Sequence, residues 1–167
     1  CLGKIIGGGM PVGAYGGRKE LMEFVSPTGP VYQAGTLSGN PIAMAAGHAM
    51  LKHLNENKAI YKQLDNISNA IKEGYQDNLK NLGLNYTINQ CGSMVNMFFT
   101  DQPVNNFEDA KNADIEKFKA FFHGHLQRGI YLPPSAFESY FLSISLSESD
   151  IEKVVRAHYE VLKEMHA

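Results

Sequence analysis

The sequence has 167 residues, of which 44% are hydrophobic, and its formal net charge at pH 7 is −2. This length and apolar content are those of roughly one globular domain with a buried core. The balanced charge argues against nucleic acid or an anionic membrane surface as a partner, and no apolar run reaches the roughly 18 residues that cross a bilayer.

The first 17 residues are rich in glycine and hold seven of the 16 glycines of the chain. Such density indicates backbone in unusual conformations or in close approach to another group. Ile5-Ile6 and residues 12–15 predict short strand ends between turns, and residues 18–24 predict a short helix. Because the sequence opens on a motif typical of the middle of a domain, we expect it to be a fragment of a longer protein.

Two helices are predicted next. Asn40 and Pro41 indicate a helix start, with Asn40 as N-cap and Pro41 at the first helical position. The following residues, 42–51, are apolar nearly all round, as is typical of a buried helix. Apolar residues then recur with a period near 3.6 over roughly 58–82, and Gly83 marks the end of this second helix.

The remainder alternates short strands with helices. Ser147 to Asp150 predict a capping box for a last helix over residues 150–165. No histidine has a carboxylate or cysteine at metal-ligand spacing, so we predict no metal site. We expect the apolar runs 94–99 and 121–122 in the core. The other predicted elements are strands over 85–90 and 93–100, a polar loop over 101–113, a helix from 114 to before Gly129, and strands over 130–132 and 141–146.

Lys4 is the main candidate for chemistry. It lies between Gly3 and an apolar pair that is followed by three glycines. A lysine that bonds covalently to an aldehyde needs an unprotonated amine in a confined site beside permissive backbone. Taken alone, however, a lysine beside glycines is more often a surface loop residue. A phosphate-binding loop is excluded, because its glycines precede a Lys-Ser/Thr pair and here they follow the lysine.

Two motifs carry a resemblance to a known family. Residues 2–14 (LGKIIGGGMPVGA) and the following GGR resemble the cofactor-lysine segment of class III aminotransferase-like pyridoxal-phosphate enzymes. Residues 35–41 (GTLSGNP) resemble the segment whose threonine reaches the cofactor phosphate of the partner subunit in a homodimer. The resemblance implies that Lys4 binds pyridoxal 5'-phosphate, with its pyridoxamine 5'-phosphate form in the cycle. It also implies that Gly35 and Thr36 bind the phosphate, although Thr36 alone would be an ordinary turn hydroxyl.

Two further stretches point to one branch of this class. Residues 28–36 (TGPVYQAGT) and 129–138 (GIYLPPSAFE) resemble the aminomutases that convert glutamate-1-semialdehyde into 5-aminolevulinate for tetrapyrrole (porphyrin) biosynthesis. The implied activity is that of a pyridoxal-phosphate-dependent isomerase, with Glu138 bordering the substrate unless it is simply a solvated loop carboxylate. A class III ω-amino-acid aminotransferase is the nearest alternative, since the motif around Lys4 is common to both. A non-catalytic assembly or interaction module is the alternative from another class.

The resemblance also implies a fold, mixed α/β and α+β, that forms the C-terminal part of a fold-type I pyridoxal-phosphate transferase. Residues 1–55 would complete the large cofactor-binding domain, 56–83 would be a connecting helix, and 84–167 would form the small C-terminal domain. The family's ring-stacking aromatic, pyridinium carboxylate and main phosphate loop lie upstream of the lysine, so we expect this chain alone to be inactive. The full-length protein would act on a small-molecule substrate as a homodimer. With only Cys1 and Cys91, too few for a disulfide framework, a reducing cytoplasm is its simplest location.

Overall fold

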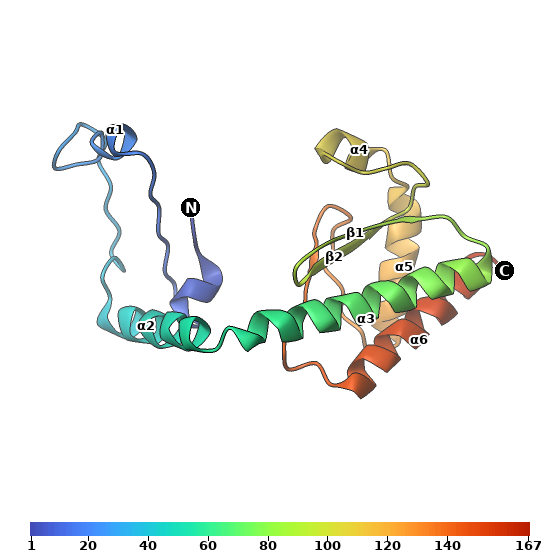
Figure 1. The fold of residues 1–167 in the computed structure, drawn as a ribbon. Coiled ribbons are helices and arrows are strands. Elements are labelled where there is room, and N and C mark those ends of the chain that lie inside the picture. The colour runs from blue at the N-terminus through green and yellow to red at the C-terminus, as the bar shows by residue number, and fades with distance from the viewer. The chain divides into compact units, whose positions relative to one another are not determined.

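The computed structural model describes every residue, Cys1–Ala167, and divides the chain into two compact units. The first unit is Cys1–Lys58 and the second is Ala59–Ala167 (Figure 1). None of the helices combines the length and hydrophobicity that a bilayer-spanning segment needs.

The first unit begins with a short 3₁₀ helix, η1 (Lys4–Gly7), and not with a strand. The strand predicted at Ile5-Ile6 is therefore wrong, because Gly8 adopts φ 58° and its N–H closes the turn onto the Ile5 carbonyl at 3.0 Å. Extended pairing in this unit is limited to two isolated bridges, an antiparallel one between Leu2 and Ala14 and a parallel one between Val25 and Val31. The helix predicted over 18–24 is present as α1, with the shorter span Lys19–Met22.

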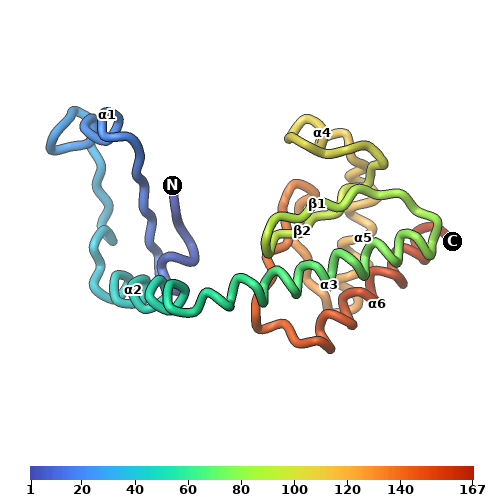
Figure 2. Tube along the Cα trace, viewed as in Figure 1, coloured from blue at the N-terminus to red at the C-terminus, as the bar shows by residue number.

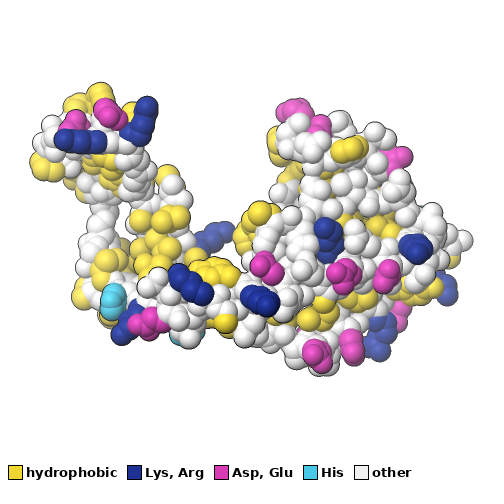
Figure 3. Space-filling view, viewed as in Figure 1, with side chains coloured by type: hydrophobic (Ala, Val, Ile, Leu, Met, Phe, Trp, Pro, Cys, Tyr) yellow, Lys and Arg dark blue, Asp and Glu magenta, His cyan; other side chains and the backbone are white.

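Helix α2 (Pro41–Glu56) starts as its sequence predicts. The Asn40 side-chain oxygen accepts hydrogen bonds from the N–H groups of Ile42 and Ala43, each at 3.1 Å, and Pro41 occupies the first turn. The prediction that this helix is buried is wrong for this chain, because only Ala43 and Gly47 are buried. Figure 3 shows hydrophobic side chains gathered on the visible face of the first unit, and large apolar side chains of α2 such as Ile42 and Leu51 are exposed.

The second unit packs helices against a three-stranded antiparallel sheet of order β1-β2-β3. Gly92, at φ 55°, turns β1 into β2, and the register places Asn89 opposite Asn96 and Val95 opposite Tyr140. Helices α3 and α6 run side by side in the same general direction (Figure 2). The elements of this unit are α3 (Ala59–Leu82), β1 (Thr87–Cys91), β2 (Met94–Phe98), α4 (Phe107–Lys111), α5 (Ile115–Gln127), β3 (Tyr140–Phe141) and α6 (Glu148–Met165).

One hydrophobic core holds the second unit together. Helix α3, which we expected to be a connector, contributes Ile71, Tyr75 and Leu79 to it. Glycines permit close helix packing: a Cβ at Gly74 would lie 2.6 Å from the Val155 side chain. The expectation that the runs 94–99 and 121–122 supply core residues is confirmed in the main. The buried cluster comprises Ile71, Tyr75, Leu79, Met97, Phe99, Phe118, Phe121, Leu132, Tyr140, Val161 and Leu162.

Helix caps in this unit follow the sequence closely. Asp114 caps α5 by accepting the Lys117 N–H at 3.0 Å. The capping box of α6 is present, since the Ser147 hydroxyl accepts the Asp150 N–H while the Asp150 carboxylate accepts the Ser147 N–H at 2.9 Å. Hydrogen bonds from the Ser147 side chain and backbone lower the pKa of Asp150, which keeps this cap charged.

Three predicted elements differ from the structure. The strand expected over 141–146 is reduced to β3. The Leu142 N–H donates to the carbonyl of Ser93, the residue just before β2, so no residue of β2 remains to pair with residues 143–146. The strand expected over 130–132 is absent. The loop expected over 101–113 contains helix α4, which is capped by Asn106 accepting the Asp109 N–H at 3.0 Å.

Candidate functional site

Lys4 stands out by its backbone as well as its chemistry. It is the only non-glycine residue with positive φ, at 53°, a left-handed conformation that strains a residue with a Cβ. Such outliers cluster at functional sites. Its side chain is exposed, and its amine forms no ion pair with any carboxylate of the chain.

Two glycines hold the Lys4 turn against α2. A Cβ at Gly8 would lie 2.6 Å from the Ala46 carbonyl oxygen, and a Cβ at Gly47 would lie 2.5 Å from the Ile6 carbonyl oxygen. Both distances are below what real Cβ contacts allow, so backbone meets backbone here only because both residues are glycine. The glycine pair therefore fixes η1, and with it Lys4, on the helix.

The Lys4 side chain borders an open hollow of about 570 Å³ in the first unit. A Cβ at Gly9, on its wall, would meet no atom within 4 Å. The lysine amine is its one charged group, so the hollow suits a ligand that reacts with an amine and presents an apolar face. It is lined by Lys4, Ile5, Gly9, Met10, Pro11 and Met50.

Gly35 and Thr36 lie in the exposed turn before α2. The Gly35 carbonyl accepts the Ser38 N–H at 2.9 Å, which closes the turn. The N–H groups of Gly35 and Thr36 and the Thr36 hydroxyl donate to no group of the chain. Three neighbouring hydrogen-bond donors without partners are suited to bind the oxygens of a phosphate group. Gly35 borders a different hollow, of about 700 Å³, from the one that Lys4 borders, although Pro11 contributes to both.

Glu138 lies in the second unit, on the exposed segment before β3. Its N–H donates to the Ser135 carbonyl at 3.1 Å, and it borders a largely apolar cavity of about 470 Å³. The carboxylate has no salt-bridge partner in the chain. This leaves it available to a ligand, as an expected substrate-facing residue requires.

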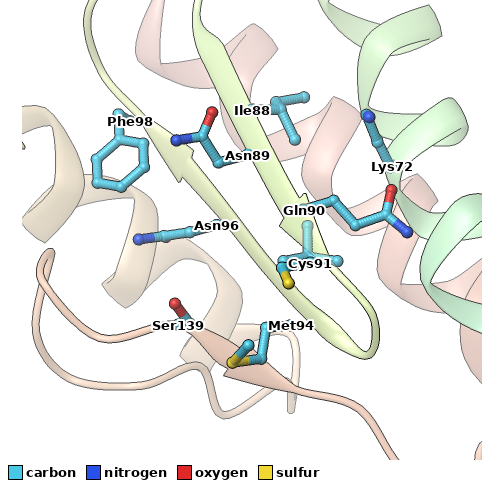
Figure 4. A pocket seen from close by; sticks show the side chains of 10 residues that line it. Lys72, Ile88, Asn89, Gln90, Cys91, Met94, Asn96, Phe98 and Ser139 are labelled. Carbon is cyan, nitrogen blue, oxygen red and sulfur yellow. The ribbon is translucent and has the colours of Figure 1, made fainter. Parts of the chain in front are cut away.

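A polar hollow on the sheet was not anticipated from the sequence. Asn89, Asn96 and Ser139 contribute to it on one side of the hairpin (Figure 4), and its volume is about 540 Å³. Asn96 is only 5% exposed, yet its side-chain oxygen has no hydrogen-bond partner. The sequence feature that could have indicated this hollow is Asn96, a polar residue inside the apolar run 94–99.

Two buried histidines of the second unit, His125 and His158, are part of its core. Burial lowers the pKa of His125 to about 4, and its Nδ1–H donates to the Phe121 carbonyl at 2.9 Å. Burial also lowers the pKa of His158 well below its usual value; its ring stacks on Tyr75 at 3.6 Å and contacts the Asn78 amide at 3.1 Å. No three His, Cys, Asp or Glu side chains are arranged to hold a metal ion.

Sequence comparison identifies the relatives of the chain. Glutamate-1-semialdehyde 2,1-aminomutase of Salinibacter ruber is 52% identical over 168 residues, covering 100% of this chain. The aminomutase of Cytophaga hutchinsonii is 53% identical over 165 residues, and one from Thermus thermophilus is 55% identical over 156 residues. The chain spans only about 38% of the length of the first two relatives and 37% of the third.

Structural comparison agrees on the fold. An ω-transaminase from Sphaerobacter thermophilus matches 99% of this chain and 38% of its own, with a TM-score of 0.81 and 26% identity. A β-phenylalanine aminotransferase from Variovorax paradoxus matches the same shares with a TM-score of 0.80 and 30% identity. The expected fold class, part of a fold-type I transferase, is thereby confirmed. The Aminotransferase class-III family itself matches residues 1–152, and the chain belongs to that family.

Proposed function

We propose that the chain is the cofactor-lysine part of a glutamate-1-semialdehyde 2,1-aminomutase, which forms 5-aminolevulinate for tetrapyrrole biosynthesis. The observation that carries this proposal is identity of 52% and 53% to two aminomutases over essentially the whole chain. Identity to the solved ω-transaminase and β-phenylalanine aminotransferase is 26% and 30%. The ω-amino-acid aminotransferase is therefore the weaker assignment.

Pyridoxal 5'-phosphate is the cofactor of this proposal, and when bound it supplies the electron sink that stabilises negative charge on the substrate carbon. Lys4 would hold it through Nζ and, once that nitrogen is released, would carry a proton to and from the substrate carbon. The free amine in an otherwise apolar hollow and the strained, glycine-fixed backbone of Lys4 support this role.

Gly35 and Thr36 would bind the cofactor phosphate across a homodimer, with Thr36 reaching the phosphate held by the partner subunit. Their three free donors support a phosphate role. Because Gly35 and Lys4 border different hollows, a phosphate from another subunit suits Thr36 better than one held beside Lys4. The stated residues supply only part of a cofactor site, so the remaining contacts would come from other parts of the longer protein.

Glu138 would border the substrate from the small C-terminal domain, its free carboxylate orienting a substrate amine. In the same proposal, residues 1–55 complete the large domain, 56–83 connect and 84–167 form the small domain. The activity would belong to the full-length homodimer in the cytoplasm, and this chain alone would be inactive.

The test is turnover of glutamate-1-semialdehyde by the full-length protein with no amino donor added. An aminomutase keeps its amine within the substrate–cofactor cycle and forms 5-aminolevulinate, whereas an aminotransferase stops without a donor. Lys4→Ala should lower the rate by about 100-fold or more, and the matched control Lys52→Ala, exposed on α2, should not. Sustained turnover only with added donor would establish the aminotransferase and overturn the proposal.

A further inference from the structure

Helix α4 lies against the turn that carries Glu138, although the two are distant in the sequence. Its first residue, Phe107, contacts Phe137, with the ring centroids 5.5 Å apart and the ring planes at 58° to each other. Aromatic pairs favour such tilted geometry at centroid separations of about 4.5–7 Å. Since Phe137 immediately precedes Glu138, this contact joins α4 to the turn of the carboxylate.

The Glu138 carboxylate has no ion pair in the chain that would hold it in place. The hydrogen bonds of the turn are local: the Glu138 N–H donates to the Ser135 carbonyl at 3.1 Å, and the Phe137 N–H donates to the Ser135 hydroxyl at 3.2 Å. These bonds close the turn without attaching it to the rest of the unit. The direction of the carboxylate therefore depends on how the turn itself is held.

The turn is attached to the second unit on both sides of Glu138. Ala136 packs against the hydrophobic core, and Tyr140 pairs with β2. Between these two points, Phe137 and Glu138 are both exposed. The contact of Phe137 with Phe107 is the aromatic contact that holds this exposed part of the turn.

Helix α4 is well fixed as a support for the turn. The Asp109 carboxylate accepts the Asn105 N–H at 2.9 Å, which fixes the start of the helix, and Ala110 is buried against the unit. The Lys111 ammonium lies over the Phe107 ring, 5.5 Å from its centroid, and adds a cation–π contact to it. The Phe107 ring is thus held in place before it meets Phe137.

The ring pair contributes little to the stability of the unit. Phe107 is 61% exposed and Phe137 is 44% exposed, and neither belongs to the buried core. Replacing side chains with this exposure changes stability only slightly in most proteins. The contact therefore affects the position of the Glu138 turn more than it affects the fold.

We propose that Phe107 is a positioning residue for substrate binding: through Phe137, it holds the turn in which the Glu138 carboxylate faces the substrate. This inference rests on the proposed function, in which Glu138 orients a substrate amine. Phe107 itself does not touch the substrate. Without the ring pair the turn populates other conformations, and the apparent affinity for substrate falls in proportion to the fraction that remains competent.

The test is steady-state kinetics of the full-length protein with glutamate-1-semialdehyde and no amino donor. Phe107→Ala should raise KM by about three- to tenfold, the change expected for the loss of one aromatic pair, and should change kcat by about twofold or less. Phe107→Tyr keeps the ring and should retain the original KM. Tyr61→Ala, which removes a 50% exposed ring from α3 in the same unit, is the matched control and should leave both constants unchanged.

A double variant separates positioning from a general loss of structure. Glu138→Gln alone should raise KM, and adding Phe107→Ala to it should raise KM no further, because Phe107 acts only through Glu138. Phe137→Ala removes the same contact from the other side and should match Phe107→Ala. The result therefore does not depend on one variant folding well.

An unchanged KM in both Phe107→Ala and Phe137→Ala would overturn the proposal. So would a loss confined to kcat, or an equal rise of KM when Phe107→Ala is added to Glu138→Gln. A protein that turns over only with an amino donor would instead overturn the aminomutase assignment. The same comparison of KM values, made at saturating donor, would then decide the role of Phe107 separately.

Discussion

The two units of the chain differ most in how they are held together. The second unit has a continuous core of 11 buried residues from three helices, two strands, the residue that follows β2 and the segment before β3. In the first unit Ala43 is the only buried hydrophobic residue, while large side chains such as Phe24 and Ile42 are exposed. The residues proposed to bind the cofactor, Lys4, Gly35 and Thr36, nevertheless lie in the first unit.

The two units are therefore stabilised by different interactions. The first unit relies on the Leu2–Ala14 bridge, at 2.7 and 2.9 Å, and on the backbone contacts made possible by Gly8 and Gly47. So small a piece with almost no apolar core buries too little surface to be stable alone. We therefore expect substitutions in the second unit to change stability, and substitutions in the first to change the cofactor site.

The largest effect should come from Phe121→Ala. Phe121 is 0% exposed and its ring lies 4.1 Å from that of His125 and 5.3 Å from that of Phe99, centroid to centroid. Removing the ring should lower the free energy of unfolding by about 3–5 kcal/mol. The control Phe24→Ala, 58% exposed, should change it by about 0.5 kcal/mol or less. Chemical denaturation of this chain measures both, and similar losses would contradict the contrast between the units.

A second effect should appear on acidification. His125 has a pKa of about 4 in the folded protein, below its unfolded value near 6.5, so the unfolded state binds the proton first and stability falls as pH falls through this window. Between pH 7 and pH 5 the loss from this residue should be about 2 kcal/mol. His125→Gln should flatten the pH dependence of the unfolding free energy, while His48→Gln, exposed in the first unit, should not. An unchanged slope in His125→Gln would refute this assignment.

Substituting alanine for one helical glycine in each unit tests whether close packing serves stability in one unit and the cofactor site in the other. In α5, a Cβ at Gly124 would lie 2.8 Å from the buried Val161 side chain, so Gly124→Ala should lower the unfolding free energy by about 1–2 kcal/mol. In α2, a Cβ at Gly47 would meet the Ile6 carbonyl, which cannot move without shifting η1.

Gly47→Ala should therefore lower cofactor occupancy, measured by absorbance of the purified full-length protein, more than it lowers stability. Gly16→Ala, with no atom within 4 Å of the new Cβ, is the control that should retain the cofactor. Full occupancy in Gly47→Ala would show that the glycine pair does not position Lys4.

The smallest effect should come from Arg128, which joins the end of α5 to α6. It pairs with Glu160 at 3.2 Å and also with Glu164, and these carboxylates are substantially exposed. Hydrogen bonds that the guanidinium donates to Glu160 and Glu164 raise the pKa of Arg128, but exposed pairs are screened by solvent. Arg128→Met should lower the unfolding free energy by about 1 kcal/mol or less, and by less at high salt. A loss above that of Gly124→Ala would contradict this ranking.

The sequence predicted best those features that depend on neighbours along the chain. The Asn40 cap, the capping box at Ser147 and the end of α3 at Gly83 are present, because each is a local hydrogen bond or backbone conformation. The strand expected over 141–146 failed since its pairing depends on how far β2 extends. The alternation of apolar and polar residues in one strand does not reveal how long the neighbouring strand is.

The candidate site likewise has residues that motifs predicted and features that depend on tertiary packing. Lys4, Gly35, Thr36 and Glu138 could be named from motifs, and their cofactor and substrate roles stay predictions. The strained φ of Lys4 depends on packing against α2 that no local pattern reveals. The contact between Phe107 and Phe137 was equally hidden, because residues so distant in the sequence meet only through the tertiary fold.

The most direct test of the central claim is to reduce the full-length protein with borohydride in the presence of pyridoxal 5'-phosphate and map the adduct by mass spectrometry. The account predicts a phosphopyridoxyl group on Lys4, absent in Lys4→Ala and retained in Lys52→Ala. An adduct on another lysine, or none, would show that Lys4 is not the cofactor lysine and would remove the basis of the proposed function.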